Sequence, residues 1–182
     1  MTAVASRPVD GPTNVRRDRW RDGGVDQVPV PGVPGQLWLC GKHAVGPDPE
    51  AALARIGGRG AIVCLNERHE LDGRYPDYVA WLEAHQGDRA VWFPIPDLHA
   101  PPLGELQHLL GDLDDRLADG QRLLVHCGAG IGRAGTIAVC LLMGRGIDRD
   151  EALRVVAAHR PMAGPEVGAQ RDLVDQLAAQ LT

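Results

Sequence analysis

The sequence predicts an α/β domain in which helices flank a short, mainly parallel sheet of four to five strands. Two observations support this fold class. From Gly35 onward, short apolar runs alternate with longer stretches that carry apolar residues at helical spacing, which is typical of β-α-β units. A glycine-rich segment, residues 128–132, also separates one apolar run from another, as in a strand–loop–helix turn.

Length and composition indicate how many domains and what size of core the chain can form. The 182 residues include 44% hydrophobic and 24% charged residues, so the chain can bury one sizeable core. Residues 1–30 are rich in Pro, Gly, Asp and Arg and contain few large apolar side chains. We therefore expect a flexible N-terminal tail over residues 1–30 and a single domain over residues 31–182.

The first half of the domain is predicted to contain three strands and two helices. The strands are expected at residues 37–40, 61–65 and 90–93, the helices at residues 49–56 and around 76–85, and a polar turn at residues 66–69. After the third strand, a proline-rich loop from Pro94 to Pro102 carries Asp97. We expect this carboxylate at the carboxyl end of the sheet, where open α/β sheets bind their ligands.

The second half is predicted to contain one strand and four helices. Leucines at helical spacing indicate a helix over residues 103–118. Residues 122–125 form an apolar strand that we place centrally, because such a strand is best buried on both faces. The helix after the glycine-rich loop is apolar all round. Two further helices follow, one capped by Asp148 and running to about Arg160, and one after residues 164–165.

Eleven residues, HCGAGIGRAGT over positions 126–136, lie between the central strand and the apolar helix. Their glycines let the backbone curl so that its N–H groups point toward a common centre. The first turn of the following helix adds unpaired N–H groups and the positive end of the helix dipole. We therefore expect phosphate or sulfate to bind here, on Gly128, Ala129, Gly130, Ile131 and Gly132.

Cys127 and Arg133 give this anion site two chemically active side chains. Five residues separate them, which makes a C-x5-R motif. We expect Cys127 to be largely a thiolate at neutral pH, because a helix N-terminus and a neighbouring arginine both stabilise the negative charge. A thiolate can attack phosphorus, and the planar fork of Arg133 matches two oxygens of a phosphoryl group.

The motif resembles the phosphate-binding loop of the cysteine-dependent protein tyrosine phosphatases, and of their dual-specificity branch in particular. The resemblance rests on His126, Cys127 and Arg133, on the interior glycines, and on the strand and helix that flank the loop. It implies the phosphatase-like fold of that family and a hydrolase that forms a cysteinyl-phosphate intermediate. Cys127 would be the nucleophile and Arg133 would bind substrate and transition state, with no metal or other cofactor.

The same resemblance implies that Asp97 is the third catalytic residue. Dual-specificity phosphatases carry an aspartate on a loop well before the cysteine, and Asp97 stands 30 positions before Cys127. It would protonate the leaving oxygen and then act as a base toward water. The alternative is that Asp97 only caps a turn, since Pro-Asp is a common turn pair.

The sequence departs from the family pattern directly after the arginine. Most members carry Ser or Thr there, whose hydroxyl can donate to the departing thiolate, and this chain carries Ala134. Breakdown of the intermediate is therefore in question, whereas phosphate binding is not. Thr136 lies about 200° further around the helix, so we do not expect it to substitute. A late glutamine positions the hydrolytic water in related enzymes, but the spacing of Gln170 favours an ordinary helix residue.

The net charge and the lengths of the apolar runs argue against two classes of partner, nucleic acids and membranes. A formal net charge of -5 argues against nucleic-acid binding, and the longest apolar run, residues 137–143, is far shorter than the roughly 20 residues that span a bilayer. The four cysteines are widely spaced, so we expect neither a disulfide framework nor a zinc site. We expect a cytoplasmic protein without a membrane or nucleic-acid partner.

The substrate class follows from the loop interior. It contains no lysine, whereas inositol-lipid phosphatases of this superfamily usually place basic residues there to meet additional phosphates. We therefore expect a phosphorylated protein or peptide, with phosphotyrosine and phosphoserine or phosphothreonine both open. Two other classes also remain open. One is a non-catalytic phosphate-binding module, which Ala134 favours, and the other is a rhodanese-like sulfurtransferase, whose cysteine loop is usually shorter.

Overall fold

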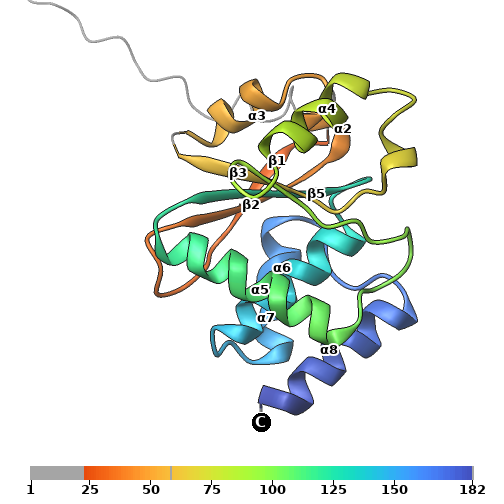
Figure 1. Ribbon diagram of the computed structural model, residues 1–182. Helices are drawn as coiled ribbons and strands as arrows, with labels where there is room; N and C mark the ends of the chain where they lie inside the picture. Colours follow the sequence, from red (N-terminus) through yellow and green to blue (C-terminus); the bar gives the residue numbers. More distant parts are fainter. Residues whose placement is uncertain (1–22, 58, 182) are drawn as a thin grey trace, which may run out of the picture.

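The computed structural model describes residues 23–57 and 59–181. Its strands form one five-stranded sheet in the order β1-β2-β5-β3-β4 (Figure 1). They are β1 (Val25–Val28), β2 (Gln36–Gly41), β3 (Gly60–Cys64), β4 (Ala90–Trp92) and β5 (Arg122–Cys127). Strand β1 pairs antiparallel with β2, and all other neighbours are parallel. The predicted α/β class with a mainly parallel sheet is confirmed, and β5 is central as expected.

Helices cover both faces of this sheet (Figure 1). One side carries α2 (Lys42–Val45), α3 (Pro49–Ile56) and α4 (Pro76–His85), and the other carries α5 (Leu103–Ala118), α6 (Gly132–Gly144), α7 (Arg149–His159) and α8 (Gly168–Leu181). A short 3-10 turn, η1 (Arg68–Glu70), follows β3. The bounds predicted for α3, α4 and α5 are confirmed. Within the described residues, no helix has the length and apolar character needed to cross a membrane.

Local sequence signals explain where two of these helices begin. The Asp48 carboxylate accepts a hydrogen bond from the Ala51 N–H at 2.9 Å, and Pro49 occupies the first turn of α3. In the same way, Asp148 accepts a hydrogen bond from the Asp150 N–H at 2.9 Å and caps α7. Each aspartate satisfies an N–H group that has no partner inside the helix, so each helix starts directly after it.

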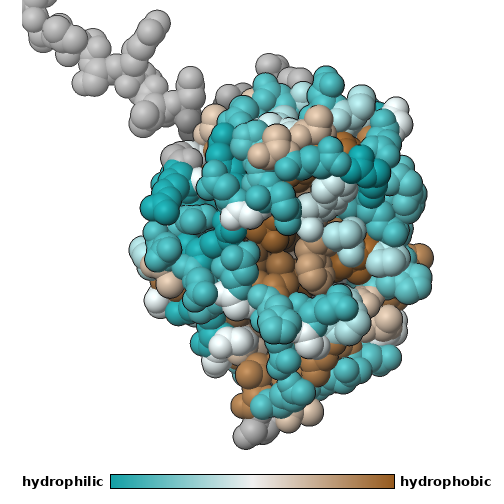
Figure 2. All heavy atoms as spheres, viewed as in Figure 1, coloured by the Kyte–Doolittle hydropathy of each residue, from teal (hydrophilic) through white to brown (hydrophobic). Residues whose placement is uncertain are grey.

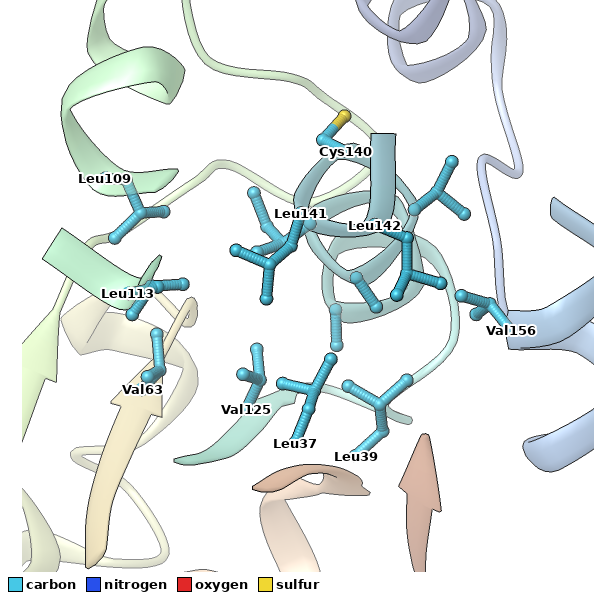
Figure 3. Packing of buried hydrophobic residues seen from close by; sticks show 14 of the residues in the cluster. Leu37, Leu39, Val63, Leu109, Leu113, Val125, Cys140, Leu141, Leu142 and Val156 are labelled. Carbon is cyan, nitrogen blue, oxygen red and sulfur yellow. The ribbon is translucent and has the colours of Figure 1, made fainter. Parts of the chain in front are cut away.

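Helix α6 lies in the larger of two hydrophobic clusters, between the sheet and the outer helices. Its residues 132–143 are all buried, which explains why this segment is apolar all round. Figure 3 shows Leu37, Leu39 and Val125 pointing from β2 and β5 toward this helix. On the opposite face of the sheet, Tyr78 of α4 belongs to the second cluster. The strand that carries the C-x5-R motif is therefore buried on both faces.

Hydrophilic and apolar residues are distributed unevenly over the surface. In the view of Figure 2, hydrophilic residues cover the helices above and below, and apolar side chains reach the surface mainly in the middle of the face. Among the described residues, the large hydrophobic side chains that are exposed belong to Leu98, Met162 and Leu181. Leu98 directly follows Asp97, so an apolar side chain is exposed beside the predicted acid.

The N-terminal boundary of the domain differs from the prediction. Residues 25–28 were expected in the flexible tail, but they form β1, an antiparallel strand at the edge of the sheet. Val28 of this strand is completely buried. The strand escaped prediction because it is short and places two polar residues, Asp26 and Gln27, between its valines. The domain thus includes residues 25–28, and residues 1–22 of the predicted tail lie outside the described residues.

Candidate active site

Strand β5 carries Cys127 to the carboxyl end of the sheet. It lies between two parallel neighbours, and Cys40 of β2 and Cys64 of β3 are both in register with His126. Cys127 is the last residue of the strand and is 3% exposed. The thiol is therefore held on rigid backbone at the point where the glycine-rich loop begins.

The loop after Cys127 curls back against β2. Gly130 has a φ of 73°, which favours glycine, and a Cβ at this position would overlap the Cys40 carbonyl. The Lys42 N–H donates to Gly128 O at 3.1 Å, which ties the start of the loop to the end of β2. Since α6 begins at residue 132, the five predicted anion-binding residues 128–132 form one turn at a helix N-terminus.

Arg133 is almost completely buried and is held by Glu70. Its guanidinium donates to both carboxylate oxygens of Glu70, at 2.7 Å from Nη1 and 2.8 Å from Nη2. Nη1 also donates to Ile95 O at 2.9 Å. The side chain of Arg133 is 3% exposed and that of Glu70 is 14% exposed. A two-pronged ion pair of this kind holds the guanidinium in one orientation.

Two N–H groups of Arg133 remain for a ligand. A guanidinium has five N–H donors, and Glu70 and Ile95 together use three of them. Nη2 keeps one further N–H, and no acceptor among the described residues takes a hydrogen bond from Nε. These two N–H groups lie along one edge of the guanidinium and match the spacing of two phosphoryl oxygens.

Asp97 reaches the same guanidinium from the loop after β4. Its Oδ1 lies 3.1 Å from Arg133 Nη2, and its side chain is 70% exposed. The Ile95 N–H donates to Leu65 O at 3.0 Å, so the chain continues alongside β3 before it turns. The imidazole Nδ1 of His99 lies 2.7 Å from the Asp97 carbonyl. The structure therefore brings Asp97 and Arg133 together, with the carboxylate open to solvent.

Electrostatic coupling keeps Glu70 and Arg133 charged. Burial alone would raise the pKa of Glu70, but hydrogen bonds from Arg133 and from the Glu67 N–H outweigh it and lower that pKa to about 2. Burial likewise opposes the charge of Arg133, but Glu70 and the nearby Cys127 raise its pKa. At neutral pH the pair therefore consists of an anion and a cation.

His126 is neutral at physiological pH. It is completely buried, and this burial lowers its pKa to about 4. Its Nε2 lies 2.6 Å from the Tyr78 hydroxyl, with which it shares a hydrogen bond. A neutral imidazole cannot stabilise a thiolate by charge. His126 therefore contributes no positive charge to the site at neutral pH.

Gln170 contacts the site from α8. Its side chain is buried, its Oε1 accepts from the Glu166 N–H at 2.9 Å, and its Nε2 donates to His99 O at 3.3 Å. The amide thus joins the loop before α8 to the loop that carries Asp97. The sequence favoured an ordinary helix residue at this position. Gln170 does lie in α8, but its amide is part of the framework around the site.

The hydroxyl of Thr136 donates its hydrogen bond within its own helix. Its Oγ1 donates to Gly132 O at 2.7 Å, one turn earlier in α6. This backbone hydrogen bond explains how a threonine is buried at the start of the helix. Ala134, which is fully buried, contributes no hydroxyl. Neither residue therefore supplies the donor that most family members place after the arginine.

Glu70 is the site residue that sequence analysis missed. It closes η1, and its carboxylate also accepts hydrogen bonds from Asn66 Nδ2 and from the Glu67 N–H, both at 2.8 Å. The position of this turn could have indicated a site residue, because the turn follows β3, a direct neighbour of β5, at the carboxyl end of the sheet. Its partner Arg133 is 63 positions away, a separation that no local pattern bridges.

Comparison with known families identifies the domain. Residues 33–179 match a family model described as PTP-SAK, Swiss Army Knife protein, DSP-PTPase phosphatase domain. The chain belongs to the DSP-PTPase phosphatase family. The resemblance seen in the C-x5-R motif is thereby confirmed, and the domain is a cysteine-dependent phosphatase domain of the dual-specificity type. This result favours a phosphatase over the rhodanese-like alternative.

One curated protein and one solved structure show further similarity to this chain. Cyclin-dependent kinase inhibitor 3 from Rattus norvegicus is 36% identical over 50 residues, which cover 28% of this chain and 24% of the relative. The match thus spans about a quarter of that relative's length. The crystal structure of Tk-PTP in its active form is 28% identical, with a TM-score of 0.64, and the alignment covers 85% of this chain and 97% of that one.

A more distant structure shares the fold. Kinase associated phosphatase, crystallised with a serine in place of its catalytic cysteine, superposes with a TM-score of 0.72 at 21% identity. The alignment covers 86% of this chain and 94% of that chain. The five-stranded sheet and its two helical layers are therefore those of the dual-specificity phosphatases.

Proposed function

We propose that the domain hydrolyses phosphomonoesters through a cysteinyl-phosphate intermediate, with Cys127 as nucleophile, Arg133 as the phosphate-binding cation and Asp97 as general acid. One observation carries the assignment of the acid. Asp97 Oδ1 lies 3.1 Å from the guanidinium nitrogen that a phosphoryl oxygen would also use. A carboxyl group at this position is within hydrogen-bond reach of an oxygen on the bound phosphorus.

The first step transfers the phosphoryl group to the enzyme. The Cys127 thiolate forms a bond to phosphorus, the bond between phosphorus and the ester oxygen breaks, and Asp97 gives its proton to that oxygen. In the second step, water gives a proton to Asp97 while its oxygen bonds to phosphorus. The sulfur–phosphorus bond then breaks, which releases inorganic phosphate and restores the thiolate.

The loop and Arg133 support both steps. The N–H groups of residues 128–133 and the open edge of the guanidinium would hold the three equatorial oxygens of the phosphoryl group. Because Glu70 already orients Arg133, little reorganisation is needed when phosphate binds. Phosphate would replace Asp97 on Nη2 and leave the carboxyl group beside the ester oxygen.

A phosphorylated protein or peptide is the substrate class we favour. The loop interior, residues 128–132, offers backbone N–H groups for one phosphate and no lysine for a second. The exposed Leu98 beside Asp97 gives the rim an apolar contact that a peptide side chain can use. An inositol lipid with several phosphates would find fewer cations here than it needs.

A non-catalytic phosphate-binding module is the second candidate function. Ala134 favours it, since neither this residue nor Thr136 offers a hydroxyl to the thiolate. The arrangement of Asp97 beside Arg133 favours catalysis, because phosphate binding alone does not need an acidic side chain at the same guanidinium. Turnover distinguishes the two functions directly.

The decisive experiment is hydrolysis of para-nitrophenyl phosphate in the presence of a chelator. We expect phosphate release by the wild type and none by Cys127→Ser, which should still bind inorganic phosphate because the loop and Arg133 are intact. Equal rates for the two proteins would refute the mechanism, and phosphate binding without turnover by the wild type would support the binding module. A phosphopeptide and a soluble phosphoinositide, compared by kcat/KM, then test the substrate class.

A further inference from the structure

Arg160 contacts the backbone of the glycine-rich loop. It directly follows α7, and its side chain is 5% exposed. Its Nε donates to Gly130 O and its Nη2 donates to Ala129 O, both at 2.7 Å. One edge of this guanidinium thus binds two consecutive carbonyl groups of the loop.

These two hydrogen bonds determine which way the loop peptides face. In a trans peptide the C=O and N–H bonds point in opposite directions, and the described chain contains no cis peptide. Because the carbonyls of residues 129 and 130 accept from Arg160, the N–H groups of Gly130 and Ile131 point away from it. The two hydrogen bonds from Arg160 therefore determine the direction of the Gly130 and Ile131 N–H groups.

The other side of the Arg160 guanidinium is held by β1. Nη1 donates to Asp26 Oδ2 at 2.6 Å, and the Asp26 side chain is 10% exposed. Weaker contacts of Nη1 reach Gly24 O at 3.3 Å and Leu39 O at 3.5 Å. A buried carboxylate thus balances the buried charge, and acceptors on two sides restrict the guanidinium to one position.

We propose that Arg160, held by Asp26, is a positioning residue for phosphate binding: it keeps the Gly130 and Ile131 N–H groups directed at the phosphoryl oxygens. This inference rests on the proposed role of the loop as the phosphate site. It also gives β1 a function, because this edge strand supplies the counter-ion of a side chain that shapes the site. Loss of Arg160 should weaken phosphate binding even where the fold is kept.

Binding of inorganic phosphate, measured by calorimetry, tests the proposal. Arg160→Lys keeps a cation beside Asp26, but an ammonium group lacks the planar edge that binds both carbonyls. We expect its phosphate Kd to rise roughly 13- to 160-fold, as for the loss of one hydrogen bond to a charged group. The double variant Arg160→Met with Asp26→Asn removes the cation without leaving a buried charge, and its Kd should rise at least as much.

Arg154→Met is the matched control, because Arg154 lies in α7, the helix directly before Arg160, and its side chain is 72% exposed. It should bind phosphate as the wild type does. A lower melting temperature for Arg160→Lys with unchanged phosphate Kd would overturn the proposal, since Arg160 would then only attach β1 to the domain. Arg160→Lys also decides the question if the double variant does not fold. Failure of the wild type itself to bind phosphate would instead refute the proposed function of the loop.

Discussion

The Arg133 guanidinium and the Glu70 carboxylate meet through two hydrogen bonds of 2.7 and 2.8 Å next to the glycine-rich loop. This contact uses the end of the guanidinium and leaves its other edge toward the site. Two arginines therefore contribute to the proposed site in different ways: Arg133, held by Glu70, is the proposed ligand-binding cation, and Arg160 bonds to the loop backbone. Both depend on acidic side chains from distant parts of the chain.

Glu70→Gln should lower kcat/KM by about 10- to 100-fold, because glutamine can accept one hydrogen bond from Arg133 but cannot hold both nitrogens of the fork. The loss should appear with every substrate, since phosphate binding itself is affected. Steady-state kinetics with an aryl phosphate measure it. Glu83→Gln is the control, because the Glu83 side chain is 54% exposed and pairs with Arg68 outside the site. Equal kinetics for Glu70→Gln and the control would exclude an orienting role.

Glu70 should also contribute to acid unfolding. Its pKa falls from 4.5 to about 2 on folding, because hydrogen bonds from Arg133 and the Glu67 N–H outweigh the effect of burial. A depressed carboxyl pKa stabilises the folded state above pH 4.5, and this stability is lost as the pH falls from about 4.5 toward 2. Glu70→Gln should therefore show a flatter decline of stability over this range, and urea titrations at pH 5 and pH 3 measure the difference.

His126 should make the protein less stable below pH 6.5. Burial lowers its pKa from 6.5 to about 4, so between these values the unfolded chain binds a proton that the folded protein does not. The contribution of neutral His126 to the free energy of unfolding is therefore fully present above pH 6.5, and it is lost as the pH drops toward 4. In His126→Gln this part of the decline should disappear, although the variant loses the contact to Tyr78 and should be less stable at pH 7 by about 1–3 kcal/mol.

Chemical denaturation at pH 7 and pH 5 tests this prediction. The exposed His108 offers a control, since His108→Gln should keep the pH dependence of the wild type. An unchanged pH dependence in His126→Gln would mean that another group causes the loss of stability in mild acid.

Thiol reactivity should single out Cys127. Burial raises the pKa of Cys64 and of Cys140 to about 12, which leaves roughly one thiol in 10⁵ ionised at pH 7. Iodoacetamide should therefore modify Cys127 first, and inorganic phosphate should slow that modification by occupying the loop. Peptide mass spectrometry after a short exposure identifies the modified cysteine. Labelling of Cys64 or Cys140 at the same rate would show that these positions open readily in solution.

The sequence predicted those parts of the structure that depend on neighbouring residues. Helix α3 has a capping aspartate and a proline at its start, and the loop has its glycines, so both were located without a structure. Glu70 and Arg160 could not be assigned in this way, because their partners are far along the chain: Arg160 meets Asp26 across 134 positions. Strand β1 was missed for a different reason, because it is short and carries two polar residues between its valines, so only its pairing with β2 defines it.

Asp97→Ala should slow hydrolysis in a way that depends on the leaving group. An alkyl phosphate, which needs a proton on its departing oxygen, should lose about 10²- to 10⁴-fold in kcat. An activated aryl phosphate should lose much less. Arg133→Lys provides the contrast, because loss of the planar fork should harm both substrates alike. An equal effect of Asp97→Ala on every leaving group would point to a different acid.

Ala134 should make breakdown of the cysteinyl-phosphate slow relative to its formation. Ala134 carries no hydroxyl and the Thr136 hydroxyl donates to Gly132 O, so neither side chain assists the departing sulfur and the thiolate is a poorer leaving group in the second step. Rapid mixing of the wild type with an aryl phosphate should therefore give a burst of released phenol, followed by a slower steady rate.

Ala134→Ser should shrink that burst and raise the steady rate. The change adds one oxygen atom at the start of α6, and a hydrogen bond of about 0.5–1.5 kcal/mol to the sulfur corresponds to a roughly 2- to 13-fold faster second step. Ala134→Val is the matched control, because it adds bulk at the same buried position without a donor, and it should not accelerate breakdown. If the wild type shows no burst and Ala134→Ser leaves the steady rate unchanged, the departing sulfur is already stabilised by the loop N–H groups, and the hydroxyl is dispensable in this chain.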